Sequence, residues 1–263
     1  MRWIARCLYL GVAVLLLVSG TSCTFVDSVI DKTSQVAGDM VGKALGERVG
    51  GRAVAGLPPE SRNIYVAGVF NSFFYVGGYE VGGNTYAPGG WTRWSVTGAA
   101  AGEEYEKAFL KRDGEREWWR IATLSKDDGK NEEVVLEALF SGAGSGAERK
   151  LLRMRGQFPG DEGPGEMPVQ ENTGAWYHEP VRFTPESMEG ALQGEETLTT
   201  PAGTFRAKHL VYKVGGSTLE WWLSDSVPGG MVQYRIREQG GEEVYTSQLI
   251  GHGTDATTRL GSF

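Results

Sequence analysis

Cysteine is almost absent from this chain of 263 residues, which contains only Cys7 and Cys23. Cys7 lies in an N-terminal stretch that has a charged start, a short apolar run and small residues at its end. This order of segments is typical of a secretory signal, which is removed from the mature protein. We therefore expect the mature chain to keep Cys23 alone, which excludes a disulfide within the chain.

Histidine and catalytic motifs are scarce as well. The three histidines, His178, His209 and His252, lie far apart in the sequence and show none of the spacings of metal ligands. The G-x-S-x-G elbow, the P-loop, H-E-x-x-H and C-x-x-C are all missing. Paired glutamates stand beside turns at strand ends, where charge is solvated and discourages edge pairing. We therefore expect no enzyme activity, no catalytic residues, no metal site and no cofactor.

Positive charge is in deficit, and long apolar runs are confined to the N-terminus. The formal net charge is −7 at pH 7, and an acidic surface repels the phosphates of nucleic acids. Beyond the N-terminal stretch, no uncharged apolar run reaches the ~18 residues that a membrane span needs. The composition therefore argues against nucleic acid as a partner and predicts no further span.

The sequence VSGTSC at residues 18–23 resembles the lipobox of bacterial lipoproteins, in which the cysteine is acylated and becomes the first mature residue. One position departs from that pattern, because Gly20 stands where Leu, Val or Ile is usual. The resemblance implies a membrane anchor at acylated Cys23 and a place in the bacterial envelope. Because Thr24 follows, it also implies the outer membrane, facing the periplasm. The alternative is an ordinary signal peptide with an incidental Cys23.

Glycine recurs at every fourth residue near the start of the expected mature chain, at Gly38, Gly42, Gly46 and Gly50. Apolar residues and alternating charges around this row predict a helix over residues 25–55. Rows of small residues at this spacing let two helix backbones approach closely. We predict that this helix packs against another helix, either its own copy in a dimer or an apolar helix over residues 64–78. The alternative is a flexible tether.

From Trp91 onward the sequence alternates apolar and polar residues between turn signals. Three such signals, each flanked by two alternating segments, are Asp113-Gly114, Gly215-Gly216 and Gly240-Gly241. Short strands joined by local turns favour a largely antiparallel sheet. We therefore predict an α+β fold, in which a curved, largely antiparallel sheet wraps over one or two helices and follows an N-terminal helix.

The chain divides accordingly into four expected parts. They are a lipoprotein signal peptide (1–22), a lipid-anchored glycine-repeat helix and linker (23–60), an antiparallel β-rich domain (61–256) and a flexible C-terminal tail (257–263). Within the β-rich domain, residues 156–180 read as a long loop with apolar side chains. We interpret this loop as a flap, and the alternative is a tolerated surface excursion.

Tryptophan is the most informative residue type of the β-rich part. In the pairs Trp118-Trp119 and Trp221-Trp222, adjacent side chains must point to opposite faces of a sheet. A large ring on each face suits a sheet with something packed on both sides, such as a helix, the flap or a ligand. The residues that we predict to line an apolar ligand site are Trp94, Trp118, Trp176, Trp222 and Met167.

Two short motifs in the C-terminal third resemble a known group of proteins. The residues that carry them are Pro201, Ala202, Gly203, Thr204 and Phe205, followed by Trp222, Ser224, Val227 and Pro228. This P-A-G-T-F…W-x-S-x-x-V-P pattern is similar to that of uncharacterised exported bacterial proteins and lipoproteins, although Thr200 replaces their usual Val. That group resembles the periplasmic lipoprotein carriers and their outer-membrane receptor. The resemblance, over roughly residues 64–256, implies a curved sheet that shelters acyl chains.

Two functions remain open at this point. The first is a membrane-anchored, non-enzymatic lipoprotein that binds an acyl chain, a lipid or a lipoprotein in the concavity of the sheet. The second is an envelope structural or assembly protein that binds another protein, or its own copy, and no small ligand. A continuous apolar cavity would favour the first function, and a filled core with an exposed apolar patch would favour the second.

Overall fold

The computed structural model describes residues 62, 66, 69, 74, 79–81, 86–98, 102–127, 130–142, 150–169 and 181–263. Four of the predicted features lie outside these residues, namely Cys23, the glycine row from Gly38 to Gly50, the helix over 25–55 and Trp176. Their roles stay predictions. No helix among the described residues is both long enough and apolar enough to cross a membrane.

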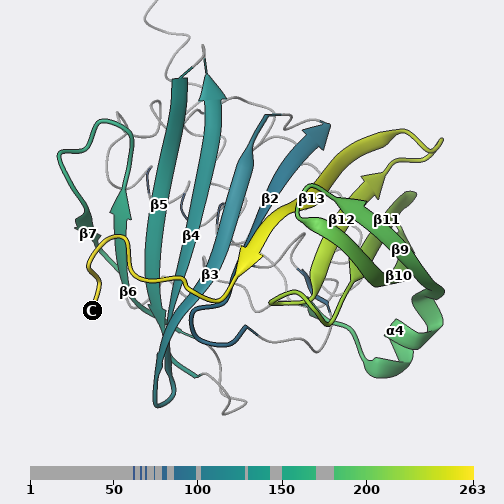
Figure 1. Cartoon of the computed structure of the whole chain (residues 1–263), viewed down its shortest axis with the longest axis horizontal. Coiled ribbons are helices and arrows are strands. Elements are labelled where there is room, and N and C mark those ends of the chain that lie inside the picture. The colour runs from purple at the N-terminus through teal and green to yellow at the C-terminus, as the bar shows by residue number, and fades with distance from the viewer. Residues whose placement is uncertain are drawn as a thin grey trace, which may run out of the picture.

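An antiparallel sheet of eleven strands dominates the described part of the chain (Figure 1). In spatial order its strands are β7 (Gly165–Met167), β6 (Leu151–Gln157), β5 (Lys130–Phe140), β4 (Arg116–Asp127), β3 (Glu104–Asp113), β2 (Trp91–Gly98), β13 (Glu243–Gly253), β12 (Met231–Arg237), β11 (Ser217–Leu223), β10 (Gly203–Val214) and β9 (Leu192–Thr200). Neighbours are consecutive along the chain except for β2 and β13, so two meanders join at that pair. Separately, β1 (Tyr79–Glu80) and β8 (Val181–Arg182) form a short parallel pair.

Hairpin turns form where the sequence supplies glycine. Gly114 follows β3 with a φ of 60°, and Gly215 and Gly216 separate β10 from β11 with φ of 57° and 88°. Glycine adopts positive φ without the steric penalty that a Cβ atom brings. The turns predicted at these positions, and the antiparallel pairing that they imply, are confirmed.

One face of the sheet, called the inner face below, packs against helical residues. Val66 and Val69 have α-helical backbone, Phe74 is π-helical, and all three are buried. The Phe74 ring lies edge-on to Trp119 of β4, with centroids 5.0 Å apart, and stacks with Phe140 of β5 at 5.5 Å. These contacts remove the apolar inner face from water, which is the main favourable contribution to folding.

The predicted α+β class is wrong. The described residues are nearly all antiparallel strand, and the one helix with defined bounds among them is α4 (Pro185–Ala191), which packs beside β10. Thr184 caps this helix, because its side-chain oxygen accepts a hydrogen bond from the Ser187 backbone N–H. The predicted class depended on an N-terminal helix, whereas the alternating segments after Trp91 form a sheet long enough to define the architecture alone.

The opposite face of the sheet, called the outer face, is crossed by the residues that follow β13. In Figure 1 this segment runs in yellow from the end of β13 across the neighbouring strands, and the C-terminus lies close to β6. Leu260 and Ser262 are buried there. The sequence predicted a flexible tail over 257–263. The structure docks it instead, because Glu137 of β5 accepts hydrogen bonds from several of its donors.

Candidate functional site

The centre of the inner face is a cluster of aromatic and polar side chains where β2, β3 and β13 meet. This inner-face cluster consists of Trp94, Glu103, Tyr105, Tyr245 and Ser247. Trp94 stacks on Tyr105, with ring centroids 4.8 Å apart, and the hydroxyls of Tyr105 and Ser247 hydrogen-bond at 2.7 Å. The side chains of the same two residues act on the pKa of Tyr245. Burial raises the pKa of both tyrosines, so their hydroxyls stay protonated.

Glu103 is the readily titrated member of the cluster. Side chains alternate along a strand, so Glu103 shares the face of Tyr105, and its charge also acts on Tyr245. Burial raises the pKa of Glu103 from 4.5 to about 7, because the charged form loses its hydration. Near neutral pH this carboxyl is therefore partly protonated, and it can donate a hydrogen bond as well as accept one.

Trp94 contributes a buried donor that has no acceptor. Only 2% of the residue is exposed, and its indole Nε1–H has no hydrogen-bond partner among the described residues. Leaving a buried N–H unpaired costs about 1–3 kcal/mol, and such groups are rare in native proteins. A bound molecule with an acceptor oxygen at this position would remove that cost.

A lysine lies two residues beyond Tyr105 on the same face. The Lys107 ammonium donates to the Phe74 carbonyl at 2.7 Å and lies 4.4 Å from the Phe74 ring centroid. It also lies 5.1 Å from the ring of Tyr86 and 5.2 Å from that of Trp119. Cation–π attraction of this kind offsets the loss of hydration. Lys107 is therefore explained by the fold and joins the sheet to the helical residues.

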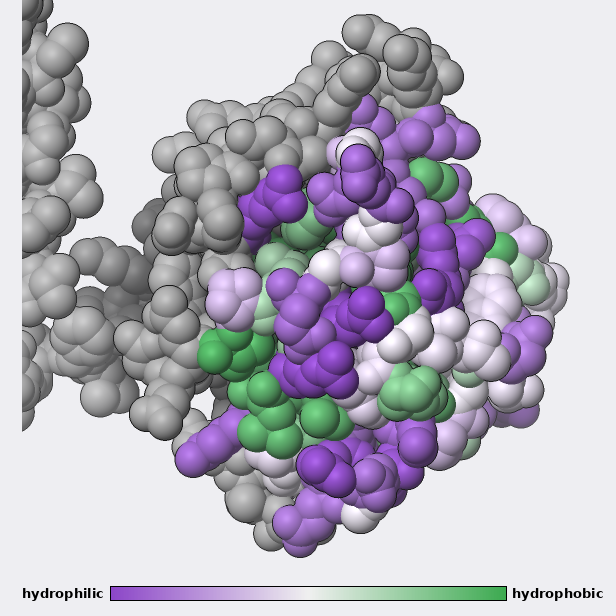
Figure 2. All heavy atoms as spheres, turned by 90° about the vertical axis from the view of Figure 1, so that its left-hand side faces the viewer, coloured by the Kyte–Doolittle hydropathy of each residue, from purple (hydrophilic) through white to green (hydrophobic). Residues whose placement is uncertain are grey.

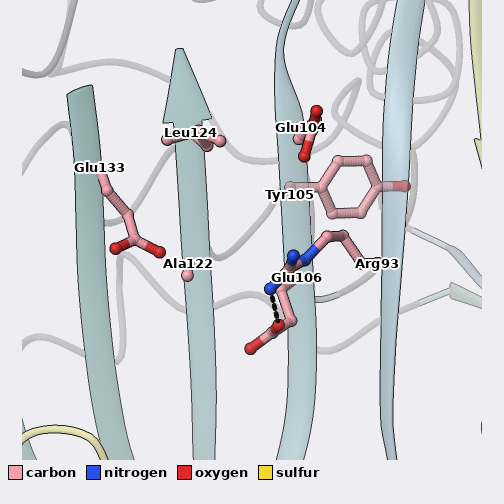
Figure 3. Close-up of a pocket in the computed structure, with 7 residues that line it drawn as sticks. All are labelled: Arg93, Glu104, Tyr105, Glu106, Ala122, Leu124 and Glu133. Atoms are coloured by element: carbon pink, nitrogen blue, oxygen red, sulfur yellow. Dashed lines mark hydrogen bonds and ion pairs between the residues drawn. The ribbon is translucent and has the colours of Figure 1, made fainter. Parts of the chain in front are cut away.

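A small polar pocket opens on the outer face between β2, β3, β4 and β5 (Figure 3). Its volume of about 50 Å³ suits ordered water better than an organic ligand. Within it, Arg93 Nη2 donates to Glu106 Oε2 at 2.7 Å. Arg120, which does not line the pocket, donates from Nη2 to Glu106 Oε1 at 2.8 Å. Burial raises the pKa of Glu106, but Arg120 and Arg93 outweigh burial and hold it below its usual value. The charges of Glu106, Arg93 and Arg120 compensate one another, so we assign these residues a role in holding the strands together.

An ionic network lies on the C-terminal meander. His209 stacks on Trp222 with ring centroids 4.4 Å apart, and its Nε2 lies 3.1 Å from Glu220 Oε2. Arg237 Nε lies 3.1 Å from the other oxygen of Glu220, and Trp222 Nε1 donates to Glu196. Groups of three or more side chains suited to a metal ion are absent from the described residues. The network pairs its own charges and offers no nucleophile.

The four described residues of the predicted ligand site fall into two separate apolar clusters. Trp94 lies in the inner-face cluster, and Met167 of β7 packs against the same core from the edge of the sheet. Trp118 lies on the outer face, in a separate apolar cluster. Trp222 of β11 is buried in the same core cluster as Trp94, and Trp176 lies outside the described residues. The ligand site stays a prediction, now centred on Trp94.

Sequence analysis missed most of the inner-face cluster. It placed Glu103 at a solvated strand end, because Glu104 follows it. A local signal did exist, since Glu103 stands two residues before Tyr105 and must share its face. By contrast, the bond between Tyr105 and Ser247 joins residues 142 positions apart. It depends on the pairing of β2 with β13, which has no local signature.

Comparison with known proteins leaves the family open. No protein family model and no curated protein matches the sequence. Three solved structures are similar in part. A candidate lipoprotein from Parabacteroides distasonis is 9% identical, with a TM-score of 0.31, over 65% of this chain and 97% of that one. MucB of Pseudomonas aeruginosa, solved with MucA, is 14% identical, with a TM-score of 0.38, over 64% and 52%.

The third is the hypothetical protein CT021 from Chlamydia trachomatis. It is 10% identical, with a TM-score of 0.40, over 67% of this chain and 92% of that one. This chain spans only about half the length of MucB. With TM-scores this low, none of the three likenesses defines the function of this protein.

Proposed function

We propose that this protein is a non-enzymatic lipoprotein of the bacterial envelope, anchored in the outer membrane through acylated Cys23. Its sheet domain binds an acyl chain that carries a hydrogen-bond acceptor. The lipobox-like sequence at residues 18–23 supports the anchor. The observation that carries the binding proposal is the buried indole N–H of Trp94 on the inner face, which has no hydrogen-bond partner among the residues that the structure describes.

The chemistry of the inner face fits an amphiphile. Stacked rings provide an apolar wall on both meanders: Trp94 with Tyr105, and Trp221 with Tyr234 at 5.0 Å. The Trp94 indole N–H donates to a carboxyl, ester or amide oxygen of the ligand. Protonated Glu103 supplies a second donor, and ionised Glu103 repels a ligand carboxylate. Binding of a fatty acid should therefore weaken as the pH rises through about 7.

A fluorescent fatty acid tests this proposal. We suggest titrating dansyl-undecanoic acid into the protein at pH 6 and pH 8, with dansyl emission as the readout. Trp94→Phe keeps an aromatic ring and removes the N–H, so affinity should fall about tenfold, as expected for the loss of one hydrogen bond to a charged group.

The matched control is Trp118→Phe, which makes the same change on the outer face and should leave the affinity unchanged. No saturable binding by the parent protein would contradict the proposal. So would equal affinities of the parent and the two variants.

Binding of another protein is a second candidate, which one observation favours. Leu152 is 45% exposed and Phe263 is 50% exposed. Figure 2, viewed from the left-hand side of Figure 1, shows hydrophobic surface on this side of the molecule, interrupted by hydrophilic residues. Leu152→Asp should then abolish crosslinking to an envelope protein in intact cells and leave dansyl-undecanoic acid binding unchanged. An identical crosslinking pattern for the parent and the variant would exclude Leu152 from such an interface.

A further inference from the structure

The residues after β13 are held on the outer face from their first positions onward. The indole N–H of Trp91 donates to Asp255 Oδ1 at 2.8 Å, and the guanidinium of Arg120 donates to the carbonyl of Thr257. Both anchoring side chains belong to the N-terminal meander, on β2 and β4. Residues 254–257 are thereby aimed across the outer face in an extended path (Figure 1).

The next five residues, 258–262, contain four donors that hydrogen-bond to a single buried carboxylate. Glu137 of β5 is fully buried. Its two oxygens accept hydrogen bonds from Thr258 Oγ1 at 2.7 Å, the backbone N–H groups of Arg259 at 2.7 Å and Leu260 at 3.4 Å, and Ser262 Oγ at 2.5 Å. All four donors are uncharged and come from one short segment. Because a buried carboxylate needs such donors to replace water, the segment and Glu137 depend on each other.

Apolar side chains of the segment fill positions on either side of this carboxylate. Leu260 is 3% exposed and packs with Ala122 of β4 and Val135 of β5. Phe263 lies against Trp118 of β4, with ring centroids 5.7 Å apart. The outer face thus provides an aliphatic contact for Leu260 and an aromatic contact for Phe263, and Gly261 and Ser262 separate these two residues along the segment.

Two arginines form further polar contacts between the segment and the outer face. One belongs to the segment itself and the other belongs to the sheet. The Arg259 guanidinium donates to both oxygens of Glu133, at 2.7 and 2.5 Å. Arg153 of β6 donates to the carbonyl of Ser262 at 3.2 Å. Bidentate arginine–carboxylate pairs and hydrogen bonds to carbonyls fix the register of a bound chain. The outer face therefore specifies the identity and the register of the residues that lie on it.

We propose that the outer face of β3–β6 is a peptide-recognition groove, specific for the sequence T-R-L-G-S-F at residues 258–263, which this chain fills in cis. The recognised class is a bent peptide with two hydroxyl side chains four residues apart, which both donate to the same oxygen of Glu137, and a leucine midway between them. The groove lies on the face opposite to the inner-face cluster, so it stands independently of the proposed function.

Binding of the same peptide in trans tests this groove. The receptor is the full chain carrying Leu260→Asp and Ser262→Ala, which undock its own segment. The probe is a fluorescently labelled peptide of residues 254–263, followed by anisotropy. We expect saturable binding to this receptor and much weaker binding to the parent chain, whose groove is already filled at a high effective concentration. Equal binding to both receptors would place the peptide elsewhere and overturn the proposal.

Two substitutions measure specificity. A probe with the Leu260→Asp change should bind at least about tenfold more weakly, and so should the parent probe on a receptor with the added change Glu137→Gln, because each removes a buried contact. A scrambled probe with the parent composition should not compete. Competition by the scrambled probe would show non-specific apolar binding and contradict the proposal.

Hydrogen exchange keeps the proposal testable if the undocked receptor does not fold. In an otherwise unchanged chain, Glu137→Gln should remove amide protection from residues 257–263 and leave the protection of β9–β12 intact. Undiminished protection of the segment would overturn the idea that Glu137 recognises this peptide. So would a loss of protection that occurs only together with global unfolding.

Discussion

Trp94 and Tyr105 stack across the β2–β3 pair with their ring planes 23° apart. The hydroxyl of Tyr105 reaches Ser247 of β13, so this stack links the two meanders where they join. The same packing holds the indole of Trp94 in place, and its N–H finds no acceptor in the described part of the chain. A donor fixed in advance on a buried aromatic wall is suited to binding, because little conformational freedom is lost when a ligand arrives.

Glu103→Gln should change the pH dependence of stability. The folded-state pKa of Glu103 is raised from 4.5 to about 7. Its stabilising effect is therefore fully present below about pH 4.5 and is lost as the pH rises through about 7. The variant should be more stable than the parent at pH 8, by on the order of 1–3 kcal/mol, and the difference should shrink toward pH 5. Urea unfolding of both proteins between pH 5 and 8 measures this, and a pH-independent difference would contradict it.

Glu106→Gln should strongly destabilise the fold at pH 7. Arg120, whose side chain is 6% exposed, would lose its charged partner, and breaking a buried ion pair costs about 3–5 kcal/mol. The control is Glu195→Gln, which breaks an ion pair with Arg206, a side chain that is 82% exposed. That change should cost less than about 1 kcal/mol. Similar unfolding free energies for the two variants would refute this contrast.

The parent protein should also lose the contribution of Glu106 in acid. The pKa of Glu106 lies below its usual value, so this stabilisation is present above the unfolded-state pKa and is lost as the pH falls through the folded-state pKa. Urea unfolding below pH 5 should therefore bring the parent and Glu106→Gln closer together. An unchanged gap in acid would argue against the ion pair as its cause.

Gly229→Ala should be far more damaging than Gly114→Ala. Both glycines have positive φ, of 72° and 60°, which costs an alanine about 1–2 kcal/mol. A Cβ at Gly229 would lie 2.1 Å from Cε2 of Tyr86, whereas a Cβ at Gly114 meets nothing within 4 Å. Thermal unfolding should show a small loss for Gly114→Ala and a loss of several kcal/mol for Gly229→Ala. Equal melting temperatures would mean that the ring of Tyr86 moves aside without cost.

Cys23→Ala should release the protein from the membrane. If Cys23 carries acyl chains, its removal leaves no anchor that the sequence predicts, and the protein should move into the soluble periplasmic fraction. Intact-mass analysis of the parent protein should show the added acyl groups. An unmodified mass, together with unchanged membrane fractionation of the variant, would contradict the lipid anchor.

The strands of this protein could be predicted because their signals are local. Alternation in the segment from Trp91, and turn pairs such as Asp113-Gly114, determine strand and hairpin without knowledge of the rest of the chain. The class was mispredicted because the helical segments received as much weight as the sheet. Propensity indicates whether a segment prefers helix, but it does not indicate how much of the fold the segment provides.

The sites were harder to predict, because their contacts are long-range. Alternation shows that Trp118 and Trp119 face opposite sides, but it does not say which side is the inner face. Glu137 lies between Leu136 and Ala138 and has the pattern of a solvated strand position. Its role depends on Ser262, which is 125 positions away, and only the docked segment reveals it.

Bound lipid is the most direct test of the central claim. Cys23→Ala protein should be purified from the periplasm without detergent and analysed by native mass spectrometry. We expect a population with one non-covalently bound acyl-bearing molecule per chain, and we expect Trp94→Phe in the same background to reduce it while Trp118→Phe does not. Spectra that show only ligand-free protein, or equal occupancy in both variants, would contradict binding at Trp94.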